Sequence, residues 1–318
     1  MKTQDRTTNP EPADFTLQFA AVPAVFPEGS CLCFSARTSG LHRSRDGGQT
    51  WENAYETLKI RQALMTTCVA LSPDFAHQPE VFAGLNGAIL RSRDGGETWL
   101  RGRLPEPLPA ISTLVISPEF EQDETLFAGT NEDGVLKSSD GGRNWISWNF
   151  GLLDLNILCL AISPDFGVDE TLFAGTSSGL FRSTNGGRAW REVTLPFDFD
   201  AVLSLALSPG FSVDHTLFVG TENNGLMLSL DRGKTWQNLT EELKENPVNQ
   251  IQYLPTAAKR DLLLLSGGSP LVSKDGGTTW KVWHQDKIKG RNVTAILAPA
   301  RPGEPALVGF EDGRISKV

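Results

Sequence analysis

The chain contains 318 residues, of which 29 are basic and 38 acidic, and its formal net charge is −9. Binding to nucleic acid depends on basic side chains that neutralise phosphates, so this charge argues against a nucleic-acid partner. No apolar run is long enough to cross a bilayer, and the sequence therefore predicts no membrane span.

Residues 1–13 are polar and include Pro10 and Pro12. We predict a flexible polar tail over 1–13 and a single folded domain over 14–318. No apolar segment typical of a signal peptide follows the first residues, so we expect a cytoplasmic protein. The four cysteines fall in apolar segments, where we expect free thiols that fill small core positions in a reducing compartment. They are Cys31, Cys33, Cys68 and Cys159.

One motif, S-x-D-x-G-x-x-W, occurs six times, first from Ser44 to Trp51. Successive copies end 44 to 48 residues apart. A period of this size is typical of a propeller or a solenoid, in which each repeat is one supersecondary unit. The six terminal tryptophans are Trp51, Trp99, Trp145, Trp190, Trp236 and Trp280.

Each copy lies between two apolar runs, as expected of a hairpin turn. An Asp carboxylate can accept backbone N–H bonds inside such a turn, and the Gly that follows it suits a positive φ. Asn185 replaces the Asp in the fourth copy, which a turn acceptor tolerates and a catalytic carboxylate would not. We therefore predict a structural role for the motif tryptophans and for Asp46, Asp94, Asp140, Asn185, Asp231 and Asp275.

Four short strands are expected in each repeat, and in the third repeat they span 112–117, 125–130, 134–139 and 144–150. The first strand of each repeat is an almost continuous apolar run, as in strands that are buried on both faces. The seventh repeat stops where its motif should begin. We predict an all-β fold, a seven-bladed β-propeller of four-stranded antiparallel blades whose last blade is incomplete, with six blades as the alternative.

A second signature, Ser-Pro-x-Phe, follows the first strand in four repeats. Proline ends the strand because it lacks a backbone donor. In three of these repeats an Asp follows the Phe by three residues, and we expect it to close the loop by accepting backbone N–H bonds. These residues are Asp123, Asp169 and Asp214.

The six motif copies resemble the Asp-box, or BNR repeat, of β-propellers. That superfamily includes sialidases, xyloglucanase-type glycoside hydrolases, the sortilin ectodomain and the photosystem II assembly-factor propeller. The resemblance covers most of the chain and implies the fold. It leaves the function open, because enzymes and non-enzymes share the same turn.

Strand alternation predicts two loop faces, and we expect ligands on the face that carries the crossovers between repeats. Charges segregate along these crossovers, and a basic half facing an acidic half could orient a protein partner. The alternative is that they are ordinary solvated loop charges. The basic candidates are Arg37, Lys59, Arg61, Arg101, Arg103, Lys287, Lys289 and Arg291, and the acidic ones include Asp198 and Asp200.

Few residues in the sequence support an enzymatic function. A sialidase needs an arginine triad and a tyrosine nucleophile, yet the only tyrosines are Tyr55 and Tyr253. Xyloglucanase-type enzymes use two propellers and an aspartate pair, for which Asp198 and Asp200 are the nearest candidates. We predict no catalytic residue, no metal and no cofactor.

The favoured function is a non-enzymatic protein-interaction or scaffolding subunit. The alternatives are a glycan-binding or glycoside-hydrolase-like propeller and an assembly factor similar to the photosystem II propeller.

Overall fold

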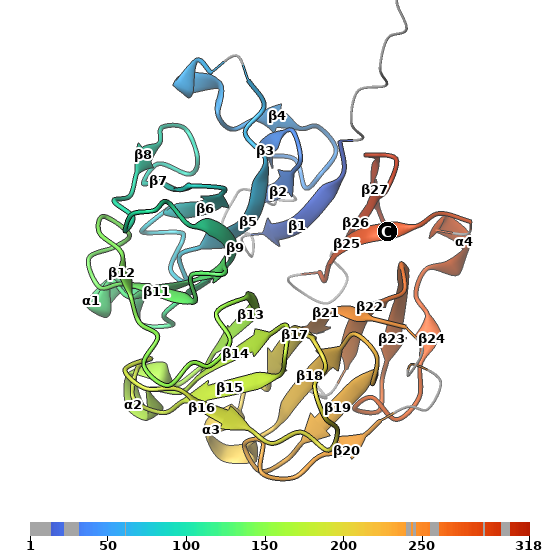
Figure 1. Ribbon diagram of the computed structural model, residues 1–318. Helices are drawn as coiled ribbons and strands as arrows, with labels where there is room; N and C mark the ends of the chain where they lie inside the picture. The colour runs from blue at the N-terminus through green and yellow to red at the C-terminus, as the bar shows by residue number, and fades with distance from the viewer. Residues whose placement is uncertain are drawn as a thin grey trace, which may run out of the picture.

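The computed structural model describes residues 14–21, 32–60, 62–239, 243, 246–254, 261–288, 290–299 and 306–318. The predicted tail over 1–13 and Cys31 lie outside these ranges. The described chain forms seven antiparallel sheets arranged in a ring, which confirms the seven-bladed propeller (Figure 1). Each of the first six sheets has four strands in sequence order from the hub to the rim.

The first four blades follow the chain from the N-terminus. Their strands are β1 (Thr16–Ala21), β2 (Cys33–Arg37), β3 (Gly40–Ser44) and β4 (Glu52–Asn53); β5 (Thr66–Leu71), β6 (Val81–Leu85), β7 (Ala88–Ser92) and β8 (Leu100–Arg101); β9 (Ala110–Ile116), β10 (Leu126–Asn131), β11 (Val135–Ser138) and β12 (Ile146–Ser147); and β13 (Ile157–Ile162), β14 (Leu172–Thr176), β15 (Leu180–Ser183) and β16 (Arg191–Val193).

The remaining blades complete the ring. They contain β17 (Val202–Leu207), β18 (Leu217–Thr221), β19 (Leu226–Ser229) and β20 (Gln237–Asn238); β21 (Val248–Tyr253), β22 (Leu262–Ser266), β23 (Ser269–Ser273) and β24 (Lys281–Val282); and β25 (Val293–Leu297), β26 (Leu307–Phe310) and β27 (Ile315–Lys317). The last blade therefore has three strands, as predicted. It adjoins the first blade, where Ala295 and Leu307 share a core cluster with Phe19 and Cys33.

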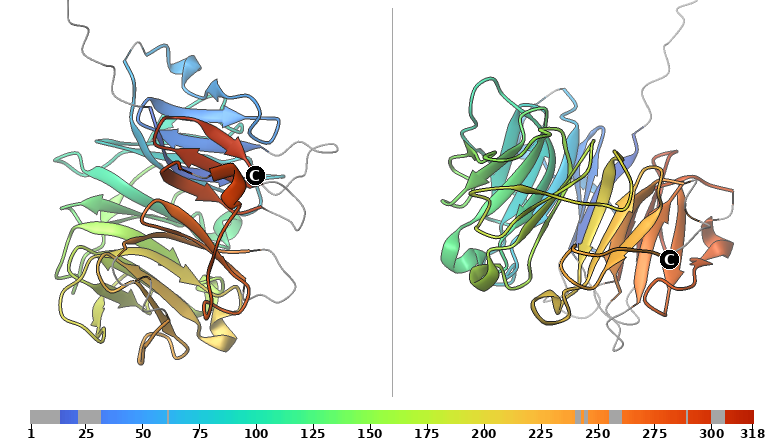
Figure 2. Two further views of the ribbon diagram at one scale, coloured as in Figure 1. Left: turned by 90° about the vertical axis from the view of Figure 1, so that its right-hand side faces the viewer. Right: turned by 60° about the horizontal axis from the view of Figure 1, so that its bottom comes forward.

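Short helical turns interrupt the loops, and the sequence analysis did not foresee them. They are η1 (Glu56–Leu58), α1 (Phe120–Asp123), α2 (Phe166–Asp169), α3 (Phe211–Asp214) and α4 (Gln285–Ile288). The turns α1, α2 and α3 are the Ser-Pro-x-Phe loops, and they lie along one edge of the ring (Figure 2). Asp123 closes its loop as expected, since its carboxylate accepts hydrogen bonds from the Ser117 hydroxyl (2.6 Å) and from the backbone N–H of Thr125 (2.8 Å). Asp169 and Asp214 do the same.

Phenylalanines on the second strands hold neighbouring blades together. The Phe82, Phe127 and Phe173 rings are buried and contact the Ser-Pro-x-Phe rings of the next blade edge to face, at centroid distances of 5.6, 5.8 and 6.0 Å. Such T-shaped pairs contribute about 0.5–1.5 kcal/mol beyond the area they bury. The hydrophobic core is therefore divided into clusters that lie between blades.

The second glycine of the repeated motif meets these same rings. Gly142 has φ +81°, and a Cβ built on it would lie 2.7 Å from Cε1 of Phe82 in the preceding blade. A Cβ on Gly96 would lie 3.0 Å from Phe34, and one on Gly187 would lie 3.0 Å from Phe127. Glycine is therefore required at this position for two reasons. The backbone has a positive φ, and the neighbouring blade leaves no room for a side chain.

We predict that Gly142→Ala destabilises the fold more than Gly276→Ala. Both residues have positive φ, so each alanine carries a backbone cost of about 1–2 kcal/mol. The Cβ at 142 also meets the Phe82 ring, whereas nothing lies within 4 Å of a Cβ at 276. Overpacking adds about 1–3 kcal/mol. Urea unfolding of both variants measures the difference; equal losses of stability would show that the contact with Phe82 is unimportant.

Candidate functional site

The crossovers between blades share one face of the ring with the turns that join the second and third strands. Backbone bonds connect the two sets: Gly87 N–H donates to Pro109 O (2.9 Å), Gly134 N–H to Leu155 O (2.9 Å), and Gly267 N–H to Pro247 O (3.1 Å). We call this the crossover face. The repeat turns and the loops that contain α1, α2 and α3 join the strands at their other ends and form the opposite face.

The six repeated motifs form turns that are held by hydrogen bonds involving the Ser and Asp or Asn side chains. We call them the repeat turns. In the first turn the Asp46 carboxylate accepts bonds from the backbone N–H groups of Gln49 and Thr50 (both 2.9 Å) and from the Thr50 hydroxyl (2.6 Å). The Ser44 hydroxyl donates to Asp46 (2.7 Å) and accepts from Gly48 N–H (2.7 Å). The Ser and Asp side chains of the motif are thus used inside the turn.

The motif tryptophans pack beside the repeat turns, and three of them connect neighbouring blades. Trp99, Trp145 and Trp190 are buried, and the other three are partly buried. The indole N–H of Trp99 donates to Ala54 O (2.7 Å), and that of Trp190 donates to Trp148 O (2.8 Å), in each case on the preceding blade. Trp236 donates to Thr194 O in the same way (3.0 Å). These contacts support the structural role predicted for the motif.

The fourth repeat turn differs from the other five at two positions that contact each other, 185 and 189. In the other five turns the residue four positions after the Asp donates a side-chain hydrogen bond to the second carboxylate oxygen, as Thr98 and Asn144 do. In the fourth turn this position is Ala189, which has no side-chain donor. Asn185 presents an NH₂ group there, which cannot accept, and its Oδ1 keeps the bonds from Ser183 (2.9 Å) and Ala189 N–H (2.9 Å). The loss of the donor thus accompanies the loss of the acceptor.

The acidic pair predicted at Asp198 and Asp200 is split by the fold. Asp198 is exposed, whereas Asp200 is only 4% exposed. The Asp200 carboxylate accepts hydrogen bonds from the backbone and side-chain N–H groups of Asn223 and Asn224, at 2.8–3.1 Å. Burial raises the pKa of Asp200, but the bonds from Asn224 and Asn223 outweigh it and lower that pKa below its usual value. Asp200 therefore anchors a crossover to the fifth blade, and the two carboxylates face different surroundings.

Several predicted basic residues are exposed on the outer segments of the first two blades. Lys59 follows η1, Arg101 lies in β8 and Arg103 just beyond it. The Arg101 guanidinium donates to Gly87 O (2.8 Å) on the crossover face. Arg37 is different, because its side chain is only 12% exposed and pairs with Asp14 (Nη1 to Oδ2, 3.3 Å). Arg37 therefore supports the fold.

Two other basic candidates belong to the last crossover. Lys287 is exposed in α4, and the guanidinium of Arg291 lies over the Phe310 ring, 5.0 Å from its centroid. Arg61 and Lys289 lie outside the described residues. The structure thus brings some basic side chains to exposed positions, and their role in binding a partner stays a prediction.

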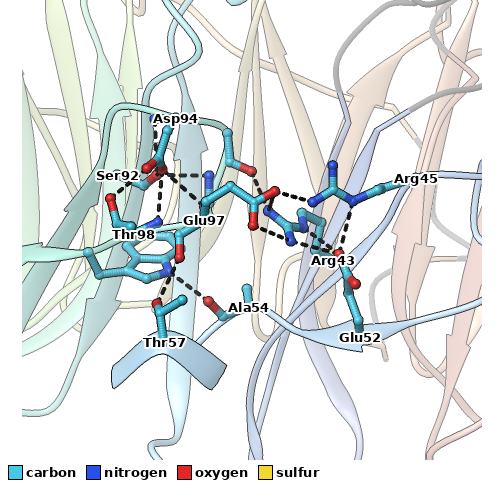
Figure 3. A network of polar contacts seen from close by, with 12 residues as sticks. Arg43, Arg45, Glu52, Ala54, Thr57, Ser92, Asp94, Glu97 and Thr98 are labelled. Atoms are coloured by element: carbon cyan, nitrogen blue, oxygen red, sulfur yellow. Dashed lines mark hydrogen bonds and ion pairs between the residues drawn. The ribbon is translucent and has the colours of Figure 1, made fainter. Parts of the chain in front are cut away.

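A polar network connects the first two blades at their outer strands (Figure 3). Arg43, whose side chain is 6% exposed, donates to Glu52 (2.8 Å), to Gly95 O (3.0 Å) and to Glu97 (3.2 Å). Arg45 also contacts both carboxylates. The network buries a guanidinium whose hydrogen bonds are satisfied, so its role is to join blades.

Seven of the thirteen exposed large apolar side chains among the described residues lie on the crossovers. They are Ile60 and Met65 on the first, Leu108 on the second, Phe150, Leu153 and Leu155 on the third, and Phe199 on the fourth. Beside Ile60 a cavity of about 480 Å³ lies between the turn at Ser39 and the first crossover. Phe199 is 89% exposed, and its φ of +34° is uncommon for a bulky residue.

Titratable side chains can serve as metal ligands and as nucleophiles. No group of three or more His, Cys, Asp or Glu side chains in this part of the chain could hold a metal ion. Burial raises the pKa of the Cys68 and Cys159 thiols to about 12, so neither is a thiolate at neutral pH. Burial also raises the pKa of the Tyr55 and Tyr253 hydroxyls. Among the described helices, none is long and apolar enough to cross a membrane.

Comparison with known proteins agrees with this architecture. Residues 34–148 match a family model described as the photosynthesis system II assembly factor YCF48. A structure of YCF48 bound to a D1 peptide superposes with a TM-score of 0.72 at 20% sequence identity, covering 97% of this chain and 94% of that one. YCF48 from Cyanidioschyzon merolae gives 0.66 at 17% identity, covering 97% and 96%.

The chain has the β-propeller fold, and its repeat turns resemble the BNR repeat. It is also similar to the xyloglucanase of glycoside hydrolase family 74 from Xanthomonas campestris, with a TM-score of 0.71 at 16% identity. That match covers 96% of the chain and 52% of the enzyme, so the chain spans about half of the enzyme's length. No curated protein sequence matches. At these identities the structural likeness shows the fold alone.

We predict that restoring both partners in the fourth turn stabilises the propeller. In Asn185→Asp/Ala189→Thr the new hydroxyl donates to the new carboxylate oxygen, as Thr98 does to Asp94. A side-chain hydrogen bond contributes about 0.5–1.5 kcal/mol. The double-mutant cycle, measured by urea unfolding, should therefore give a favourable coupling energy of that size. A coupling energy of zero would show that the two natural changes are independent.

We further predict that stability falls between pH 4 and pH 2. Hydrogen bonds from Thr279 lower the pKa of Asp275 to about 2, below the value of about 3.9 for an unfolded Asp. The ionised group therefore stabilises the fold above about pH 4, and this contribution is lost as the pH falls.

The fourth turn supplies the control for this pH dependence. Asp275→Asn/Thr279→Ala copies that turn and removes one titrating group. Thermal unfolding at pH 7 and pH 3 should show a smaller loss of stability in this variant than in the natural chain. An equal loss would mean that other groups govern the acid sensitivity.

Proposed function

We propose that this propeller is a protein-binding subunit that holds a segment of another protein on its crossover face. The observation that carries this proposal is the series of exposed apolar side chains on four successive crossovers. Water-exposed apolar groups that cluster on one face are typical of protein interaction sites. Exposed aromatic residues in particular are enriched among the residues that dominate binding energy.

The fourth crossover shows how such a group is held in place. Asp200 is bonded to Asn223 and Asn224, and the Phe197 ring packs against the cluster between the fourth and fifth blades. Between these two anchors the chain presents Asp198 and Phe199 to solvent. A backbone held at positive φ with its ring in water carries a strain of about 1–3 kcal/mol, and strain of this kind is often found at functional sites.

The similarity to YCF48 adds support of a different kind. The YCF48 structure was determined with a D1 peptide bound, and it has nearly the same extent as this chain. A role as a protein-binding assembly factor is therefore our more specific proposal. The glycan-binding and hydrolase alternatives have less support. Of two cavities described on the crossover face, one has Glu56 as its only carboxylate. The other is lined by Glu311, which accepts a hydrogen bond from Asn292, and by Asp312, which pairs with Arg314.

The test is affinity purification from the source organism with variants on the two faces. We expect Leu153→Glu and Phe199→Glu each to reduce recovery of a bound protein by about tenfold or more, since losing one buried anchor costs about 2 kcal/mol. Matched controls are Val168→Glu and Val213→Glu, which change equally exposed valines on α2 and α3 of the opposite face. If all four variants retain the partner, or if no protein copurifies with the natural chain, the proposal is wrong.

A further inference from the structure

A basic residue directly before the motif Ser reaches from each of the first four blades toward the next blade. These residues are Arg43, Arg91, Lys137 and Arg182, and each pairs across the sheet with a phenylalanine of the second strand, namely Phe34, Phe82, Phe127 and Phe173. We call the four basic residues the bridging cations. Their charged ends are directed at the repeat turn of the following blade.

Three of the four bridging cations donate to an equivalent backbone carbonyl, whereas Arg91 donates to Glu80 of its own blade. Arg43 donates to Gly95 O (3.0 Å), Lys137 to Gly186 O (3.5 Å) and Arg182 to Arg232 O (2.7 Å). In each case the acceptor is the carbonyl that precedes the second glycine of the next repeat turn.

Lys137 has both kinds of contact, a backbone carbonyl and aromatic rings. Its Nζ lies 5.4 Å from the ring centroid of Phe127 and 5.5 Å from that of Trp148. The site between blades is therefore built for a cation with an apolar stem, since aromatic faces attract the charge and aliphatic carbons pack beside it.

The fifth blade lacks this side chain, although the site that would receive it is present. Leu228 stands at the position of the cation and pairs with Phe218. The sixth blade still supplies a repeat turn, with Gly276 as the residue that offers the carbonyl. Here a cavity of about 280 Å³ opens between the two blades. It is lined by Ser208, Asp214, Thr216, Phe218, Leu228, Leu230, Gln237, Leu239, Tyr253, Asp275, Gly276 and Thr278.

The lining residues stand at sequence positions equivalent to those that surround Lys137, with several substitutions. Phe218 corresponds to Phe127, and Leu239 takes the place of the Trp148 ring. Asp214 corresponds to the loop-closing Asp123, but it is exposed where Asp123 is half-buried. Tyr253 stacks edge to face on Phe218 at 5.9 Å and so replaces the missing Ser-Pro-x-Phe ring. Two carboxylates, Asp214 and Asp275, give the cavity a negative charge.

We propose that this cavity binds an arginine or lysine side chain of a protein partner, in the position that the chain's own bridging cations occupy between the preceding blades. The alkyl stem packs on Phe218, Leu228 and Leu239, and the charged end reaches Gly276 O beside Asp214. This site lies on the face opposite the crossovers, so it is independent of the interaction proposed there.

The direct test is methyl NMR of the full chain, titrated with Nα-acetyl-L-argininamide. We expect shifts confined to Leu228, Leu230 and Leu239. The neutral isostere Nα-acetyl-L-citrullinamide should bind about tenfold more weakly or worse, a difference of about 1.4 kcal/mol, because it has the shape without the charge. Equal binding of the two probes, or no shift up to the solubility limit of the argininamide, overturns the proposal.

A second test fills the cavity from within. Leu228→Arg restores a bridging cation, so it should abolish argininamide binding and raise the melting temperature. Val272→Arg is the matched control, because residue 272 occupies the same position in the sixth blade, while the following three-stranded blade has no repeat turn. The proposal fails if Leu228→Arg still binds the probe, or if it is no more stable than Val272→Arg. If Leu228→Arg does not fold, the comparison of the two probes on the natural chain decides alone.

Discussion

The contact between a second-strand phenylalanine and the next blade is the constraint on which the rest of this propeller depends. The phenylalanine side chain packs edge to face with an aromatic ring of the following loop, and its Cε1 lies against the second glycine of the following repeat turn. Both contacts cross from one blade to the next, so a blade alone would leave its phenylalanine exposed to water. The repeat is thus stable only as part of a ring, which is the physical reason that repeat units of this kind occur in arrays.

Two sets of polar groups surround that contact, and each satisfies a different part of the backbone. The repeat-turn carboxylates satisfy backbone N–H groups within each turn, and three of the bridging cations satisfy a carbonyl of the neighbouring turn. Because a buried polar group without a partner is costly, the loss of a donor favours the loss of its own acceptor. The pair Asn185 and Ala189 shows one such joint change. Leu228 shows the opposite case, in which a donor is lost, its acceptor stays and a cavity results.

Sharing this fold does not decide the function. Propellers of similar shape include YCF48 with a bound D1 peptide and a xyloglucanase. The groups available for binding are those on surfaces that the ring leaves uncovered. Apolar crossover residues lie on one face, and an acidic cavity with aromatic walls lies on the other. Function therefore has to be argued from these groups, because the blades themselves are used for stability.

The sequence by itself determined the number of blades, the three-stranded last blade, the repeat turns and the loop-closing role of Asp123, Asp169 and Asp214. These features rest on local hydrogen bonds and on a period that can be counted along the chain. The burial of Asp200, the pairing of Arg37 with Asp14 and the cavity beside Leu228 were decided by tertiary structure alone. Each depends on residues about 20 or more positions apart that meet only when the sheets twist and the ring closes, as in the contact of Asp200 with Asn224. A charge in a loop looks the same in the sequence whether it ends in water or against a neighbouring turn, and only the packing of one blade on the next decides between the two.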